Sequence, residues 1–209
     1  MNQSSYIILG AGASGLLLAY RMSLDSYFDD KSILIIDQVK DKGNDKTWCY
    51  WEEGEGEWDE LLTKKWPKVF FGSKDFTETL DISPYSYKMI RSEKFYHKLW
   101  RSIELKSNIT FVEDSVKTYT EIDNRVKVVT NKSTYFGLKL LNSILDKTVY
   151  ETQQKYPVLQ QHFVGWFVKT KTDCFDDSIA TFMDFNVPQN GNTRFMYVLP
   201  LGPNKALLE

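Results

Sequence analysis

Short apolar runs near the start of the chain predict buried parallel strands. Residues 6–9 read YIIL and residues 33–36 read ILII, without the polar alternation of a half-exposed strand. Between them, residues 16–22 form a stretch without Gly or Pro that predicts a helix, and the turn GAGASG precedes it at residues 10–15. The order strand, glycine turn, helix, strand predicts a βαβ unit.

After residue 40 the pattern is more varied. Residues 40–66 are polar, charged and rich in Trp, which predicts a long surface excursion. A helix is expected over residues 92–103, because Phe95, Leu99 and Ile103 recur at intervals of four. Short strands are expected at residues 69–71, 85–90 and 109–112, a β-meander at 116–120 and 125–130, and a buried strand at 136–145.

The last third of the chain predicts antiparallel strands separated by turn residues, at residues 163–169, 179–185, 194–199 and 206–208. This change near residues 147–157 predicts two parts: a dinucleotide-binding domain over 1–150 and an antiparallel β region from 151 to 209. The sequence ends at NKALLE, inside a strand-like run. Because a strand needs partners for its backbone groups, we expect a portion of a longer protein.

The glycine turn has the spacing GxGxxG, which points to a bound pyrophosphate. Gly10 allows the tight turn, Gly12 lets the backbone approach phosphates, and Gly15 lets the helix pack closely. Asp37 lies 22 residues beyond Gly15, where an acid accepts hydrogen bonds from a ribose. The predicted cofactor-binding residues are Gly10, Ala11, Gly12, Ala13, Ser14, Gly15 and Asp37. The alternative is a tight βα turn in a domain without a nucleotide.

The composition and charge of the chain exclude several classes of protein and of site. With 26 basic and 28 acidic residues the net charge is −2, which argues against a dedicated nucleic-acid binder. Two cysteines far apart exclude a disulfide scaffold and favour a reducing cytoplasm. The acids between Glu52 and Glu60 lack the ligand spacing of a metal loop, so we expect a solvated face and no metal. A meander that interrupts the βα repeats favours FAD over NAD.

Several segments in order carry a family resemblance. GAGASG is followed by DKGNDKTWCYWEE, YSYKMIRSEKFYHKL, QHFVGWFVKT, ATFMDFNV and RFMYVLPLGPNKALLE. Together they resemble the N-terminal portion of the flavin-dependent lycopene cyclases, particularly the bacterial lycopene β-cyclases. The resemblance implies an α/β fold: a Rossmann-like FAD-binding domain of the glutathione reductase type with an antiparallel β substrate region. One departure is Asn142-Ser143, where many flavoproteins carry a glycine turn beneath the flavin.

The resemblance also implies chemistry. The family uses non-covalent FAD in its reduced form, with NADPH or NADH as reductant, to cyclise the ends of lycopene or a related acyclic carotenoid without net redox change. Its catalytic acid matches Glu209, which could otherwise be an ordinary charged residue after a strand. Because such substrates live in lipid, we expect a cytoplasmic protein that associates peripherally with a membrane. The alternative is an FAD-dependent monooxygenase or other oxidoreductase acting on a hydrophobic substrate.

Overall fold

The computed structural model describes residues 3–209, which divide into two compact units. Unit 1 comprises the chain up to Asp45 together with Glu93–Val158, and unit 2 comprises Lys46–Ser92 together with Leu159–Glu209. The division therefore differs from the expected boundary at residue 150, because residues 46–92 join the C-terminal part. The reason is strand pairing between segments far apart in the sequence, which local patterns do not reveal.

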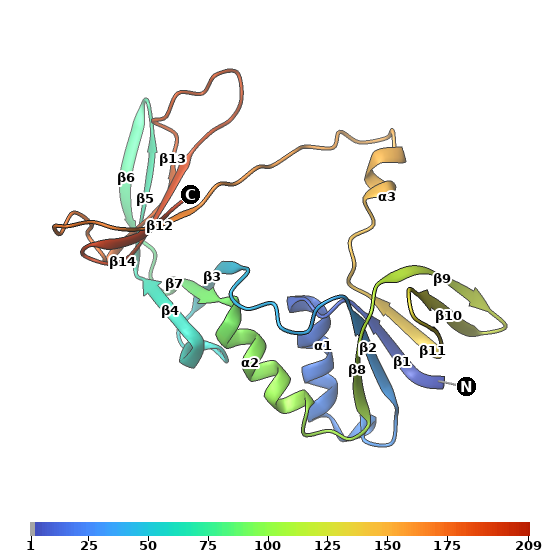
Figure 1. Cartoon of the computed structure of the whole chain (residues 1–209). Helices are drawn as coiled ribbons and strands as arrows, with labels where there is room; N and C mark the ends of the chain where they lie inside the picture. The colour runs from blue at the N-terminus through green and yellow to red at the C-terminus, as the bar shows by residue number, and fades with distance from the viewer. Residues whose placement is uncertain (1–2) are drawn as a thin grey trace. The chain divides into compact units, whose positions relative to one another are not determined.

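Unit 1 is built on a six-stranded sheet of order β8-β2-β1-β11-β10-β9 (Figure 1). Strands β1 (Gln3–Leu9), β2 (Ile33–Asp37), β8 (Ile109–Glu113) and β11 (Thr134–Asn142) are parallel. Strands β9 (Val116–Ile122) and β10 (Arg125–Thr130) add antiparallel pairs at the β11 edge. The helical segments are α1 (Ala13–Leu24), η1 (Ser26–Phe28), α2 (Ser92–Ile103) and α3 (Lys147–Thr152).

The burial pattern of unit 1 explains these elements. Ile7 and Leu9 of β1 pack with Ile36 of β2 in one apolar cluster, and each is fully buried. Strands buried in this way need uninterrupted apolar residues. The order β1, α1, β2 confirms the predicted βαβ unit, and the antiparallel pairing of β9 with β10 confirms the β-meander. The expected apolar stripe of α2 is also buried, with Leu99 fully enclosed. The strand expected at residues 136–145 is β11, of which only part is buried.

Unit 2 contains two sheets. The larger has the order β12-β15-β14-β13-β5-β6 and the smaller the order β3-β7-β4. The larger sheet comprises β5 (Lys68–Ser73), β6 (Phe76–Asp81), β12 (Trp166–Lys169), β13 (Ile179–Asp184), β14 (Met196–Gly202) and β15 (Lys205–Leu208). The smaller comprises β3 (Thr47–Glu53), β4 (Leu62–Trp66) and β7 (Tyr85–Arg91), and η2 (Asp59–Leu61) precedes β4.

One expectation for this unit is wrong. Residues 40–66 do not form only a surface excursion, since β3 and β4 lie within them and Trp66 is fully buried. The four C-terminal strands pair antiparallel with one another, as expected, and β13 also pairs in parallel with β5. Trp66 donates a hydrogen bond from Nε1 to the Pro200 carbonyl at 3.2 Å, and it shares an apolar core with Leu199 and Leu207. This core holds the two chain segments of unit 2 together.

Two residues of the acidic run, Glu52 and Asp59, do not form a solvated face but pair with the buried ammonium group of Lys88. Lys88 on β7 is fully buried, and its Nζ lies 2.8 Å from Glu52 Oε2 and 2.6 Å from Asp59 Oδ1. It also donates to the Gly54 carbonyl at 2.9 Å. Burial alone would lower the pKa of Lys88, but its hydrogen bonds to Asp59 and Glu52 outweigh burial and raise it. The pKa of Asp59 is lowered, first by its hydrogen bond from Lys88.

We expect the substitution Lys88→Met to lower the free energy of unfolding by about 3 kcal/mol, because it leaves two carboxylates without their buried partner. Lys64→Met is the matched control, since Lys64 pairs with the half-exposed Asp177 at 2.7 Å and should contribute at most about 1 kcal/mol. Urea unfolding of both variants measures the difference. Equal losses in the two variants would contradict the assignment.

The same ion-pair cluster predicts a pH dependence of stability. The contribution of Lys88, whose folded-state pKa is raised, is complete below the ordinary lysine pKa of about 10.4 and is lost as pH rises through the raised value. The contribution of Asp59 is present above about 3.9 and is lost as pH falls through its lowered value. The urea midpoint should be measured from pH 3 to 11. In the Lys88→Met variant, the decreases in the midpoint that this cluster causes at the acidic and alkaline ends of the range should be absent.

Candidate functional site

The glycine turn after β1 folds as its spacing predicts. Gly10 has a φ of +93°, in the region that favours glycine, and its N–H donates to the Ile36 carbonyl at 2.9 Å. A Cβ at Gly15 would overlap the Gly10 carbonyl, so the start of α1 packs directly against the turn. These two glycines are therefore required by the fold itself.

Gly12 differs from the other two glycines. A Cβ built there would meet no atom within 4 Å, so no packing within the chain requires a glycine. It is the N-cap of α1, and no side chain caps this helix end or places an acid in its first turn. Ala13 begins the helix, and Ser14 beside it is exposed. The backbone N–H groups here can therefore receive an anionic group such as a phosphate.

Asp37 lies beside this turn, as expected of a ribose-binding acid. Its carboxylate accepts hydrogen bonds from the Ala11 N–H at 2.5 Å, the Val39 N–H at 3.2 Å and Lys42 Nζ at 2.9 Å. Burial favours the neutral acid, but hydrogen bonds from Lys42, Ala11 and Val39 outweigh it and hold the pKa of Asp37 below its ordinary value. Lys42 was not predicted, because it lies in a polar segment without any periodic pattern.

Ser143 supports the glycine turn from the neighbouring strand. Its Oγ donates to the Leu9 carbonyl at 2.8 Å and lies 3.2 Å from the Gly10 carbonyl. A Cβ at Gly10 would lie 2.5 Å from this oxygen. The departure noted at Asn142-Ser143 therefore has a local function: the serine fixes the turn that Gly10 makes.

Glu209 occupies a separate place, within unit 2. Its N–H donates to the Tyr197 carbonyl at 3.0 Å, and its own carbonyl accepts from the Tyr197 N–H at 2.7 Å. A Cβ at Gly165 would lie 3.8 Å from Cβ and Cγ of Glu209. Within residues 3–209 the half-buried Glu209 side chain makes no ion pair. The sequence did not predict these neighbours.

Three groups that interact electrostatically with Glu209 are neutral: the thiol of Cys49 and the hydroxyl groups of Tyr87 and Tyr197. Burial raises the pKa of the Cys49 thiol to about 11; a hydrogen bond with Tyr87 lowers it, and the charge of Glu209 raises it further. Burial also raises the pKa of Tyr87, with Cys49, Tyr197 and Glu209 contributing. The pKa of Tyr197 is raised by burial and then by Glu209. The carboxyl group therefore lies near two phenols and a thiol that stay protonated at neutral pH.

Aromatic rings lie next to this carboxyl environment. Tyr87 lies 4.9 Å from Trp51 and 5.5 Å from Phe182 between ring centroids, and Trp51 and Phe182 are 5.2 Å apart. Phe182 in turn contacts Tyr197 at 5.9 Å, and Tyr197 contacts Phe195 at 5.1 Å. Aromatic faces attract cations, so this group offers both an apolar surface and electron-rich rings. Trp51 therefore packs in this aromatic group and is not confined to a loop.

The remaining candidate chemistry is sparse. Within residues 3–209, no group of three or more His, Cys, Asp or Glu side chains is arranged to hold a metal ion. Cys174 is exposed and lies 3.4 Å from the Thr170 hydroxyl, and Cys49 is half-buried. His162 is exposed and contacts Gln160. Over the same residues, no helix combines the length and apolar character needed to cross a membrane.

The α/β fold of the chain is similar to that of solved FAD-dependent oxidoreductases. PqsL of P. aeruginosa, in a mutant form, matches with a TM-score of 0.62 and 12% identity over 99% of this chain and 60% of its own. A geranylgeranyl bacteriochlorophyll reductase-like protein of Thermoplasma acidophilum has a TM-score of 0.64 at 10% identity, over 100% and 56%. NikD, an amino acid oxidase, has a TM-score of 0.65 at 12% identity, and the match covers 100% of this chain and 69% of NikD.

The family follows from a second comparison. The family model of the lycopene cyclase proteins matches residues 6–209, so the chain belongs to the lycopene cyclase family. This confirms the family resemblance read from the sequence. A comparison with curated proteins gave no match. The chain spans 60% and 56% of the first two structures it resembles.

Proposed function

We propose that unit 1 binds FAD without a covalent bond. The support is the fit of the turn: the open space at Gly12, the uncapped start of α1, and the Asp37 carboxylate beside Ala11. Gly12, Ala13 and Ser14 would face the pyrophosphate, and Asp37 would accept hydrogen bonds from the ribose. When bound in its reduced form, the flavin supplies negative charge that stabilises a nearby cation, with NADPH or NADH as the electron source.

We propose that the complete protein cyclises the ends of lycopene or a related acyclic carotenoid to β-rings. The observation that carries this proposal is Glu209, a carboxyl group beside neutral phenols and the aromatic group of Trp51, Tyr87 and Phe182. An apolar polyene suits such aromatic surroundings, and a carboxylic acid is the proton donor that an alkene requires. Membership of the lycopene cyclase family supports the same reaction.

The proposed reaction conserves all atoms and electrons. The step starts from the protonated form of Glu209, whose carboxyl group transfers its proton to the terminal alkene and leaves a tertiary carbocation. A second alkene of the same chain attacks this cation and closes a six-membered ring. A ring carbon then loses a proton to the carboxylate of Glu209, which restores the acid, and the electrons of the broken C–H bond form the final double bond. The buried ring of Tyr87 would shield the cation from water, which would otherwise trap it as an alcohol.

Expression of the complete gene in a host that accumulates lycopene tests the proposal. We expect a shift of cell colour from red to orange-yellow and β-ring products in the pigment extract. The purified enzyme should give the same products without oxygen, provided that the flavin is reduced. Unchanged lycopene in both experiments would overturn the proposal. A peripheral association with membranes, which a lipid-soluble substrate requires, would be tested by flotation with vesicles.

A second candidate is an FAD-dependent monooxygenase or oxidoreductase acting on a hydrophobic substrate. The fold similarity favours it, since PqsL is described as a probable FAD-dependent monooxygenase. The two candidates differ in their need for oxygen. Product that forms only in air and carries a new oxygen atom would identify the monooxygenase.

A further inference from the structure

An exposed apolar strip leads into β12, the edge strand of the larger sheet of unit 2. Residues 159–165 form no helix or strand and continue directly into β12 (Figure 1). The apolar strip comprises five residues that are between 51% and 87% exposed: Leu159, Phe163, Val164, Trp166 and Phe167. Large apolar side chains that gather on a surface in this way mark a site of interaction.

The charge beside the apolar strip is positive. Residues 152–172 contain three lysines and no Asp or Glu, whereas the whole chain has a net charge of −2. Lys169 on β12 pairs directly with Lys205 on β15, and both are exposed. Like charges that lie opposite each other are unfavourable, so an anion between them would relieve the repulsion.

These two lysines and the exposed Lys171 form a basic cluster at the end of β12. None of the three makes an ion pair with a residue in the range 3–209. Their ammonium groups are therefore available to a partner that carries negative charge.

An apolar strip next to a basic cluster matches the surface of an anionic lipid bilayer. Trp and other amphipathic side chains favour the boundary between hydrocarbon and water, and lysines there reach lipid phosphates through their long stems. The irregular backbone of residues 159–165 cannot enter the hydrocarbon, because its N–H and C=O groups would lose their hydrogen bonds. Only the side chains would penetrate, as in a peripheral protein.

The apolar strip also adjoins the proposed catalytic acid. Gly165 lies between Val164 and Trp166 in the chain, and a Cβ built on it would lie 3.8 Å from Cγ of Glu209. Trp166 pairs with Leu208, the residue before Glu209. An apolar polyene that leaves a bilayer along the strip would therefore arrive beside Glu209.

We propose that the apolar strip and the basic cluster bind the surface of an anionic lipid bilayer, from which the polyene substrate enters. The apolar side chains lie at the level of the lipid headgroups and upper acyl chains, and the lysines contact the phosphates. Binding to lipid does not depend on cyclisation, and only the entry of the polyene rests on the proposed function.

Flotation of the purified complete protein with lipid vesicles tests the inference. The vesicles consist of phosphatidylcholine alone or of equal parts phosphatidylcholine and phosphatidylglycerol. We expect the wild type to partition more strongly into the anionic vesicles. Lys169→Gln/Lys171→Gln should weaken this partitioning about 30-fold and leave that into phosphatidylcholine unchanged. Leu159→Gln should weaken partitioning into both kinds of vesicle about tenfold.

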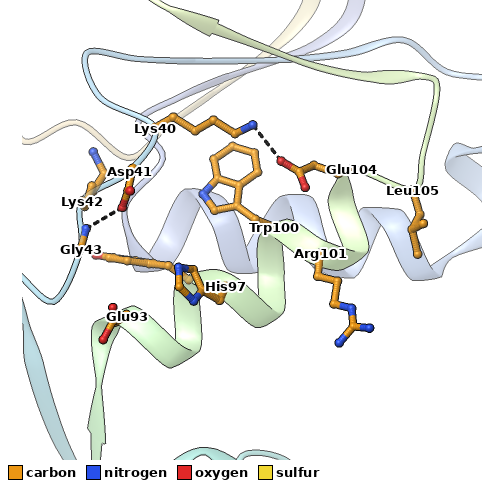
Figure 2. A pocket seen from close by; sticks show the side chains of 11 residues that line it. Lys40, Asp41, Lys42, Gly43, Glu93, His97, Trp100, Arg101, Glu104 and Leu105 are labelled. Atoms are coloured by element: carbon orange, nitrogen blue, oxygen red, sulfur yellow. Dashed lines mark hydrogen bonds and ion pairs between the residues drawn. The ribbon is translucent and has the colours of Figure 1, made fainter.

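Matched controls carry the same substitutions elsewhere on the surface. Leu105 is 83% exposed just after α2, where Figure 2 shows it following the charged residues Arg101 and Glu104. Leu105→Gln should float as the wild type does, because an isolated exposed leucine needs no partner. Lys74→Gln/Lys117→Gln removes the same charge from two exposed positions outside the basic cluster and should also float normally. Thermal unfolding without vesicles shows whether each variant is folded.

Trp166 gives a second readout. Lipids brominated on their acyl chains quench the fluorescence of a Trp that reaches them, so the wild type should lose more fluorescence than Trp166→Phe. Equal quenching would show that another part of the complete protein covers the strip, and would overturn the inference. So would a wild type that does not float, or Leu159→Gln that floats equally well. Flotation that depends on Leu159, with lycopene unchanged in both vesicles and detergent, would refute the proposed function alone.

Discussion

The substitution Glu209→Gln in the complete enzyme should lower the rate of lycopene cyclisation by at least about 100-fold, because it removes the proposed proton donor. Glutamine keeps the shape of the side chain, and the backbone hydrogen bonds of residue 209 to Tyr197 do not depend on its carboxyl group. Flavin content and thermal stability should therefore stay close to wild type. The measurement is the initial rate of β-ring formation by the purified, reduced enzyme.

The matched control for this experiment is Glu78→Gln. Glu78 lies on strand β6 of the same unit, whose residues are all exposed, so its substitution removes an equal charge from an exposed position. Its rate should match the wild type. If Glu209→Gln also cyclises lycopene at the wild-type rate, Glu209 is not the acid, and another carboxyl group of the complete protein must be sought.

The second large effect concerns Gly12. We expect Gly12→Ala to fold normally, because its Cβ meets no atom of the chain within 4 Å, yet to lose most of its FAD, because the methyl group occupies space needed by the pyrophosphate. Purified protein should be colourless or weakly yellow, with at least about tenfold weaker FAD binding in fluorescence titrations. Its urea midpoint should remain that of the flavin-free wild type.

Two further glycines serve as controls for this result. Gly202 in β14 also has open space around its Cβ position, so Gly202→Ala should keep both stability and flavin. Gly15→Ala should instead unfold or lose much of its stability, because its Cβ overlaps the Gly10 carbonyl. Full flavin retention by Gly12→Ala would show that the phosphates lie elsewhere.

Local patterns sufficed to predict the βαβ unit with which unit 1 begins. The apolar runs of β1 and β2, the glycine spacing and Asp37 are all features of neighbouring residues, and the structure brings them together as predicted. The surroundings of Glu209 could not be predicted in the same way. They depend on β3, β7, β14 and the residues after β15 meeting across long stretches of sequence, and no periodic pattern marks such partners.

Buried polar residues were also beyond the reach of patterns. Lys88 reads as a surface lysine in an alternating strand, and its burial becomes intelligible only through Glu52 and Asp59. Trp100 reads as one more apolar residue of α2, whereas its unpaired N–H is visible only in three dimensions. For both residues the sequence shows the type of side chain. It does not show whether that side chain has a hydrogen-bond or ion-pair partner.

The parallel pairing of β5 with β13 has a consequence for synthesis on the ribosome. Lys68 of β5 pairs with Ile179 of β13, which is synthesised about 110 residues later. At typical translation rates this delay is on the order of 5–20 s. During that interval Val69 and Trp66 cannot pack against the later residues of the core that bury them in the folded protein. The nascent chain is therefore expected to depend on chaperones during this delay, and slower translation past residue 92 would increase its aggregation.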